Sequence, residues 1–263
     1  MRMTTGVLLG VLAWARVSGA QDGAPAAEKP AGPPPTAQAS APIDLTGYWV
    51  SVISEDWRWR MVTPAKGDYA SVPLTLASKT VADTWNPAKD TAAGEACRGY
   101  GAPGIMRLPG RLHITWADAQ TLQVDIDTGQ QTRRLAFAGG AAAKGAGTWQ
   151  GVSAAVWERP TRSSALATAA GPGDPARMRG GNLKVVTTRL KPGYLRKNGL
   201  PYSAQAVLTE YWDLSHEPNG DWWLVVTSVV HDPLYLQTDW ITSLNFKKEA
   251  DGSKWDPTPC VAK

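Results

Sequence analysis

Gly47, Tyr48 and Trp49 open the first expected strand and constrain the fold more than any other local feature of the chain. At the start of the first strand of a small antiparallel barrel, a glycine allows a tight kink of the backbone. The tryptophan two residues later can then cover the closed end of the barrel with its indole. Many short strands follow this motif, so the sequence predicts a β-barrel.

Alternating apolar and polar residues, bounded by turn residues, predict nine strands. The clearest alternation is that of Leu122, Val124 and Ile126. The expected strands are 47–53, 111–116, 121–127, 132–138, 153–158, 183–190, 204–213, 222–230 and 240–247. Tight turns are expected at 127–129 and 217–221. With short links and no helix between most strands, the predicted fold is all-β, an antiparallel up-and-down barrel of about eight or nine strands.

One long excursion, residues 61–107, separates the first two strands. It contains one short predicted helix over 76–85, with Val81, Ala82 and Trp85 on one face and Asn86-Pro87 ending it. A long connection after the first strand of an up-and-down barrel commonly covers the open end. We therefore expect a lid.

The N-terminal residues are typical of an export signal. Arg2 precedes a short apolar run, and Ser18-Gly19-Ala20 offers a cleavage site, so residues 1–20 are predicted to be a signal peptide. Residues 21–42 are predicted to be a disordered Pro/Ala linker, and 161–181 a disordered insertion in a single barrel domain over 43–263. No segment resembles a membrane span. The expected location is the periplasm or the medium.

Charge and composition restrict the possible partners. Removing residues 1–20 leaves 25 of the 27 basic residues against 23 acidic ones, a net charge of +2, and no basic cluster stands out. A nucleic-acid partner is therefore not expected. The 13 Trp and 7 Tyr against 2 Phe suit surfaces that meet amphipathic or ring-bearing ligands. The same tryptophans could instead fill a wide barrel core.

Cys97 and Cys260 are the two cysteines of the chain. In an exported protein such a pair predicts a disulfide, here closing a loop of roughly 160 residues, for which the chain-entropy model gives roughly 5 kcal/mol. Neither cysteine has a second Cys or a His at metal-ligand spacing, so no metal site is predicted.

The best candidate for ligand binding is Trp57-Arg58-Trp59-Arg60. On a strand, the two tryptophans would share one face and the two arginines the other. If the arginines point into the barrel, they could bind a carboxylate or phosphate. If the tryptophans point into the barrel, they would form an aromatic clamp. This stretch leads into the excursion, so we expect it and Tyr69 to border a cavity at the barrel mouth that also reaches His113 or Glu210.

Motifs for catalysis are missing: the chain contains no Gly-x-Ser-x-Gly, no His-Glu-x-x-His and no phosphate-binding glycine loop. Asp127-Thr128-Gly129 matches an aspartic-protease motif but occurs once, in an expected hairpin turn. The candidate acid–base residues are His113, Glu210, Tyr211 and Asp68. Each has a plain alternative as a surface residue. No cofactor is predicted.

Gly47-Tyr48-Trp49, the strand meander and the lid-like excursion resemble the lipocalins and the wider calycin superfamily, whose barrels bind small hydrophobic ligands. The segments 67–74 and 100–110 also resemble exported soil-bacterial proteins of unknown function. The resemblance implies an exported barrel that binds a hydrophobic or aromatic, possibly anionic, small molecule. The alternative is a cofactor-free isomerase, cyclase or hydrolase acting in the barrel lumen.

Overall fold

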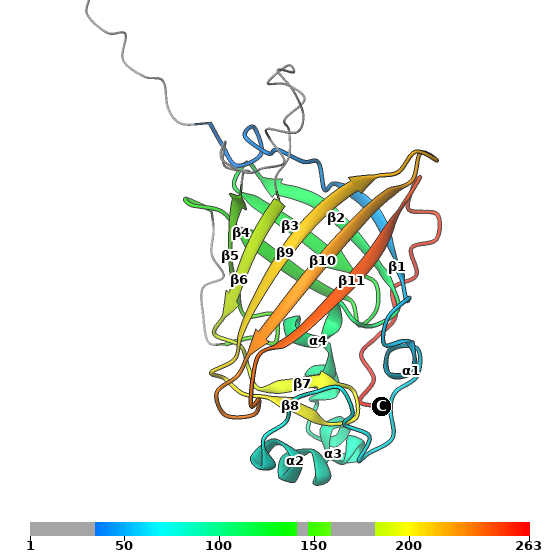
Figure 1. The fold of residues 1–263 in the computed structure, drawn as a ribbon, viewed down its shortest axis with the longest axis vertical. Helices are drawn as coiled ribbons and strands as arrows, with labels where there is room; N and C mark the ends of the chain where they lie inside the picture. Colours follow the sequence, from blue (N-terminus) through cyan, green and yellow to red (C-terminus); the bar gives the residue numbers. More distant parts are fainter. Residues whose placement is uncertain (1–34, 141–146, 159–181) are drawn as a thin grey trace, which may run out of the picture. The chain divides into compact units, whose positions relative to one another are not determined.

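Nine strands close into a barrel in the computed structural model, which describes residues 35–140, 147–158 and 182–263. The barrel strands are β1 (Gly47–Val52), β2 (Arg111–Asp118), β3 (Thr121–Ile126), β4 (Gln131–Ala136), β5 (Val152–Glu158), β6 (Asn182–Thr188), β9 (Val207–His216), β10 (Trp222–His231) and β11 (Trp240–Glu249). Each pairs with its neighbours along the chain, and β1 pairs with β11 to close the ring (Figure 1). The predicted all-β barrel and its nine strands are confirmed.

One pairing departs from the predicted antiparallel pattern. β4 and β5 run parallel, joined through the pairs Leu135–Ser153 and Ala136–Ala154. The reason is geometric: when consecutive strands alternate in direction around a ring, an odd number of strands leaves one neighbouring pair parallel. The barrel is therefore mixed rather than purely antiparallel.

Period-two alternation sends one face of each strand into the barrel. Leu112 and Ile114 of β2, like Leu122, Val124 and Ile126 of β3, are at most 4% exposed. Trp49 is fully buried, and its indole N–H donates to the carbonyl oxygen of Leu45 at 2.9 Å. Gly47 has φ +115°, a conformation that L side chains rarely adopt, which explains the glycine at this position.

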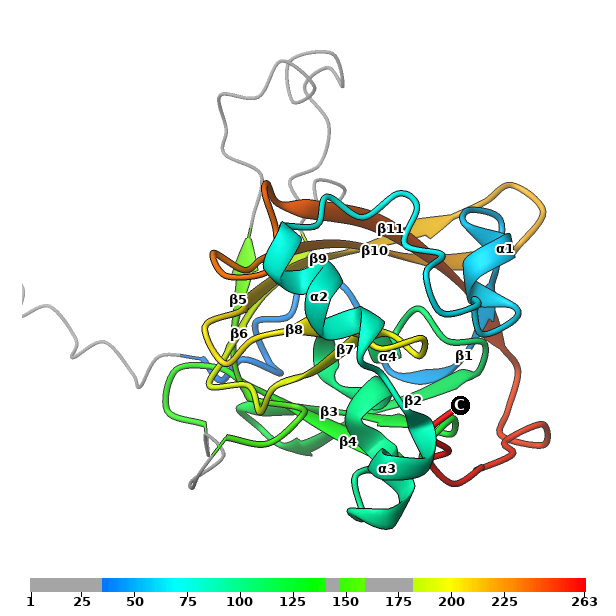
Figure 2. The ribbon, with the colours of Figure 1, turned by 90° about the horizontal axis from the view of Figure 1, so that it is seen from below.

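The excursion between β1 and β2 covers one end of the barrel (Figures 1 and 2). It contains α1 (Trp57–Arg60), α2 (Leu76–Asp83), α3 (Pro87–Ala92), the 3₁₀ helix η1 (Ala96–Tyr100) and α4 (Ala102–Ile105). A two-stranded sheet of β7 (Gly193–Arg196) and β8 (Leu200–Tyr202) joins it. We call this assembly, residues 56–107 with 193–202, the lid.

Local sequence explains the helix that was predicted. Thr75 caps α2 by accepting a hydrogen bond from the Ser78 backbone N–H, and Ala82 is fully buried. Asn86 then caps α3, with Pro87 as its first residue. The Asn86-Pro87 pair, which was predicted to end the helix, therefore also begins a second one.

A second apolar core lies where the lid meets the barrel strands. Leu74, Leu195, Leu200, Tyr202 and Trp240 are among its members, each at most 4% exposed. Figure 2 places α4 within the ring of strands, and all four of its residues are buried. The lid therefore packs into the barrel mouth as a plug.

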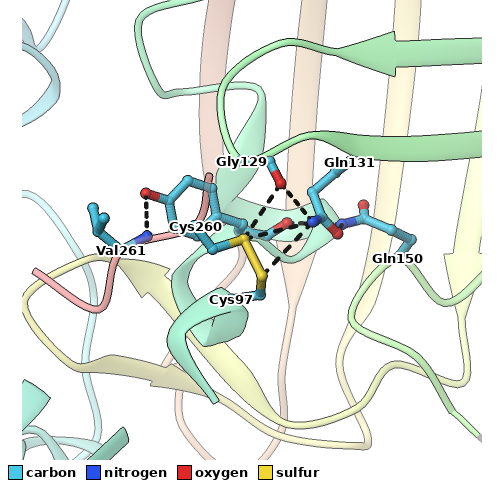
Figure 3. Close-up of a disulfide and its surroundings, with 7 residues drawn as sticks. Cys97, Gly129, Gln131, Gln150, Cys260 and Val261 are labelled. Atoms are coloured by element: carbon cyan, nitrogen blue, oxygen red, sulfur yellow. Dashed lines mark hydrogen bonds between the residues drawn. A yellow bond between two sulfur atoms is a disulfide. The ribbon is translucent and has the colours of Figure 1, made fainter. Parts of the chain in front are cut away.

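The predicted disulfide between Cys97 and Cys260 is confirmed and ties the C-terminal segment to η1 (Figure 3). Thr258 forms two backbone hydrogen bonds with the β3–β4 turn. Its N–H donates to the Asp127 carbonyl, and its own carbonyl accepts from the Gly129 N–H. Val261 N–H donates to the Tyr100 hydroxyl at 3.2 Å. The C-terminal segment thus links the lid to the barrel wall.

Ordered structure begins before residue 43, where the sequence predicts the domain to start. Ala37 is 7% exposed, and its carbonyl accepts from the Trp157 indole at 2.9 Å. The predicted signal peptide, most of the predicted linker and the predicted insertion over 161–181 lie outside the described residues. Within the described parts, no helix is both long and apolar enough to span a bilayer.

Candidate functional site

Three buried arginines meet at the junction of lid and barrel. Arg60 ends α1, Arg107 follows α4, and Arg196 ends β7. They are 4%, 5% and 5% exposed, respectively, although arginine is among the residues least often buried. Such burial requires partners for the guanidinium groups.

Each guanidinium is only partly satisfied. Arg60 Nε donates to the Arg107 carbonyl at 2.9 Å, and its Nη1 pairs with Glu55. Arg107 Nη2 donates to Asp56 at 2.7 Å. Arg196 donates through Nη1 to the Ala70 carbonyl at 2.8 Å and through Nη2 to the Ser71 hydroxyl at 2.9 Å.

One buried nitrogen of each arginine finds no acceptor among the described residues. These atoms are Arg60 Nη2, Arg107 Nη1 and Arg196 Nε. Buried donors are nearly always hydrogen-bonded, because an unmade bond costs about 1–3 kcal/mol. Three such donors close together therefore form an unsatisfied cationic cluster.

The same three arginines line one small cavity of about 30 Å³. The other lining residues are Trp59, Val62, Thr63, Pro64, Gly99, Gly104, Leu108, Leu195 and Lys197. This cavity combines cationic and apolar walls in a partly enclosed space.

Two indoles stack on Arg107 and Arg196. The guanidinium carbon of Arg107 lies 4.9 Å, and that of Arg196 5.8 Å, from the centre of the Trp240 ring. Arg196 also lies 5.1 Å from the Trp59 ring, which Arg58 contacts at 5.3 Å. Cation–π contacts of this kind are worth about 0.5–2 kcal/mol each. They help to fix the positions of the Arg107 and Arg196 guanidinium groups.

The electrostatics favour an anion. Burial lowers the pKa of Arg60 to about 10, against the opposing effect of Glu55 and with a further lowering by Arg107. Burial likewise lowers the pKa of Arg196 to about 10, and Arg107 again adds to the effect. Neither Arg196 nor Lys197 forms an ion pair within the described parts of the chain. A bound anion would relieve both the desolvation and the mutual repulsion.

The stretch 57–60 is a short helix, so its expected strand alternation was wrong. Trp57 and Arg58 are exposed, whereas Trp59 and Arg60 turn toward the cavity. Asp68 fixes this arrangement by accepting from Trp59 Nε1 at 3.1 Å and from Arg58 at 3.0 Å. The hydrogen bond from Trp59 lowers the pKa of Asp68, and the charge of Arg58 adds to that effect. Asp68 is thus a positioning carboxylate.

Tyr69 and His113 lie away from the cavity lining. The Tyr69 hydroxyl donates to Asp83 at 2.8 Å, beside a surface hollow on the lid. His113 is on the outer face of β2, stacked on Tyr48 with ring centres 4.1 Å apart. Trp255 lies edge-on to the same pair.

Glu210 points into the barrel, not to the mouth. It is fully buried and forms a bidentate ion pair with Arg133, with oxygen–nitrogen distances of 2.9 and 2.5 Å. Thr187 accepts a long bond of 3.4 Å from Arg133. Tyr211, next along the strand, lies outside against Lys184. The candidate acid–base residues His113, Glu210, Tyr211 and Asp68 therefore do not converge, and neither His113 nor Glu210 lines the cavity of Arg60.

The barrel interior is packed. Trp49, Trp212 and Phe246 are its largest apolar side chains and are at most 1% exposed. Hollows of several hundred Å³ lie at the surface, for example beside Lys247 and Lys254. Within residues 35–140, 147–158 and 182–263, no three His, Cys, Asp or Glu side chains gather as metal ligands.

Sequence reasoning missed Arg196 and Trp240 as site residues. Nothing local marks them, because Arg196 reaches the cavity through the β7–β8 hairpin, and Trp240, at the start of β11, contacts Arg107 and Arg196 only in the folded chain. Comparison with family models, curated proteins and solved structures gave no match.

Proposed function

We propose that the protein binds a small anionic molecule in the cavity formed by Arg60, Arg107 and Arg196. One observation carries the proposal: three arginines at most 5% exposed line the same cavity, and each has a buried N–H without an acceptor in the described structure. Guanidinium groups match carboxylates and phosphates in charge and in hydrogen-bond geometry. An anion would supply the missing acceptors.

The site differs from the one that a lipocalin-like barrel implies. There the ligand would occupy the lumen, but here Trp49, Trp212 and the Arg133–Glu210 pair occupy that space. The mouth cavity keeps the expected stretch 57–60 as the recognition element, through Trp59 and Arg60. The likeness to lipocalins and calycins therefore extends to the barrel and the Gly-x-Trp opening.

We also propose that the protein is exported to the periplasm or the medium. The proposal rests on the predicted signal peptide and is supported by the Cys97–Cys260 disulfide, because disulfides persist in oxidising compartments. A binding protein outside the cytoplasm would meet its ligand directly in the environment of the cell.

The alternative of an enzyme acting in the lumen gains no support from the geometry. Catalysis by proton transfer needs an acid or base within hydrogen-bond reach of one substrate. Glu210 is sealed in an ion pair inside the barrel, and His113 is stacked on the outer wall. Binding is therefore the function that the site supports best.

Titration of the purified mature protein with sodium acetate and sodium phosphate, followed by the NMR shifts of the Trp59 and Trp240 indole N–H groups, tests the proposal. We expect saturable shifts at constant ionic strength. Arg196→Gln should weaken binding at least tenfold, and Arg60→Lys should weaken it less. Arg134→Gln, a change at an exposed arginine of β4, is the matched control and should bind as the parent does. Failure of both anions to shift either indole would overturn the proposal.

A further inference from the structure

An exposed apolar segment borders the arginine cavity. Trp57, Met61 and Val62 are 66%, 56% and 71% exposed, and all three lie within six residues of chain. We call them the apolar rim. The segment belongs to α1 and the turn that follows, at the side of the lid (Figure 2).

In the described parts of the chain, no other three large exposed apolar residues lie within six residues of one another. Single exposed apolar residues are normal in soluble proteins and need no explanation. The remaining large exposed apolar residues in the described parts are scattered along the chain, at Leu76, Val156, Trp222, Leu234, Ile241 and Val261. Three together beside a cationic cavity call for a functional reason.

Val62 connects the two features. It is one of the most exposed apolar residues and also lines the cavity of Arg60 and Arg107. Leu108 and Leu195 continue the apolar wall on the inner side. A ligand that reaches from the guanidinium groups toward Val62 would therefore contact apolar side chains along its length.

Resting on the proposed function, we propose that the ligand is a carboxylic acid with an apolar body, its carboxylate held by Arg60, Arg107 and Arg196 and its body lying on the apolar rim. The cavity interior would recognise the charge, and the rim would recognise the body. The protein would then discriminate amphiphilic anions from inorganic ones.

The size of the cavity favours a carboxylate over a phosphate. Its volume of about 30 Å³ corresponds to roughly two or three water-sized groups. A carboxylate presents two oxygens, whereas a phosphate monoester presents three terminal oxygens around a tetrahedral phosphorus. The two carboxylate oxygens can accept from the nitrogens of Arg60, Arg107 and Arg196 that lack an acceptor, because a carboxylate oxygen accepts more than one hydrogen bond.

The rim makes a quantitative expectation possible. Burial of one methylene group raises affinity roughly fourfold. A ligand that covers the rim should therefore bind more tightly with each added carbon until the rim is covered. Head-group affinity alone would give no such dependence.

The test is a series of linear carboxylates, namely acetate, butanoate, hexanoate and octanoate below their micelle concentrations, with octylamine and octyl phosphate as head-group probes. The same indole NMR shifts report binding. We expect affinity to rise at least tenfold from acetate to octanoate, no competition by octylamine, and weaker binding of octyl phosphate than of octanoate.

Trp57→Ser and Met61→Ser, at rim residues that do not line the cavity, should flatten the chain-length dependence and leave acetate binding unchanged. Val156→Ser replaces an exposed apolar residue of β5 and is the control. This variant should keep the chain-length dependence of the parent. Equal affinity for acetate and octanoate would overturn the inference while leaving the proposed function standing. Octylamine binding as tightly as octanoate, or octyl phosphate binding more tightly, would also overturn it. If the parent protein bound none of these anions, both the inference and the proposed function would be overturned.

Discussion

The guanidinium of Arg196 stacks on the indole of Trp59, with its central carbon 5.1 Å from the ring centre. Arg196 comes from the β7–β8 hairpin and Trp59 from α1, so this contact joins two parts of the lid that are far apart in sequence. The Trp59 indole also donates to Asp68. The contact thus supports both the lid and the proposed site.

Trp59→Ala should destabilise the protein by about 2 kcal/mol, because it removes aromatic packing, a hydrogen bond and two cation–π contacts. Trp57→Ala is the matched control. Its side chain is 66% exposed, so the expected change lies within about 0.5 kcal/mol. Urea unfolding followed by circular dichroism measures both. Equal losses for the two variants would contradict the structural role of Trp59.

Glu210→Leu should cost about 3–5 kcal/mol, because it leaves the buried Arg133 charge uncompensated inside the barrel. Replacing both partners, with Arg133→Met and Glu210→Leu, should restore most of that loss, since a well-packed apolar pair avoids desolvating two charges. A double-mutant cycle in urea gives the coupling. Additive losses for the two single variants would show that the pair is not coupled.

Gly129→Ala should be far more destabilising than Gly220→Ala. Both glycines sit in hairpin turns at positive φ, +82° and +88°, so both substitutions carry the same backbone strain of about 1 kcal/mol. A Cβ at Gly129 would lie 2.3 Å from the Tyr100 ring, whereas one at Gly220 meets nothing within 4 Å. The midpoint of thermal unfolding is measured for both variants. Similar midpoints for Gly129→Ala and Gly220→Ala would contradict the close contact with Tyr100.

The Tyr69 phenol should ionise late in an alkaline titration. Burial raises its pKa to about 12, and the hydrogen bond to Asp83 and the charge of that carboxylate add to the effect. Since the neutral phenol is favoured in the folded state, its contribution to stability is present below about pH 10 and is lost as the pH rises toward 12. Asp83→Asn should lower the pKa of Tyr69. Absorbance at the phenolate band, with Tyr69→Phe to identify the signal, measures the shift.

The barrel was predictable from sequence because its strands alternate in burial. Leu122, Val124 and Ile126 show the pattern, and each of the nine predicted strands overlaps a barrel strand. The β7–β8 hairpin was missed because every one of its strand residues is buried, which leaves no alternation to read. Trp57 to Arg60 alternates by residue type yet forms one helical turn, since four residues carry too little information to separate the two periods.

The site was only partly predictable. The sequence indicated Arg60 and Trp59 by their composition and by their place before the excursion. Arg107 and Arg196 join them through tertiary packing of the lid, and no local spacing encodes that meeting. Glu210 was singled out as a candidate acid–base residue, but its buried partner Arg133 comes from a strand that is distant in sequence.

The pairing of β1 with β11 has a consequence for the timing of folding. The ring cannot close until the segment Trp240–Glu249 is available, so a nascent chain lacking it keeps two open strand edges. Pairing between such distant segments is intrinsically slow. In the export that we propose, this delay would withhold the final tertiary step until the last strand has crossed the membrane.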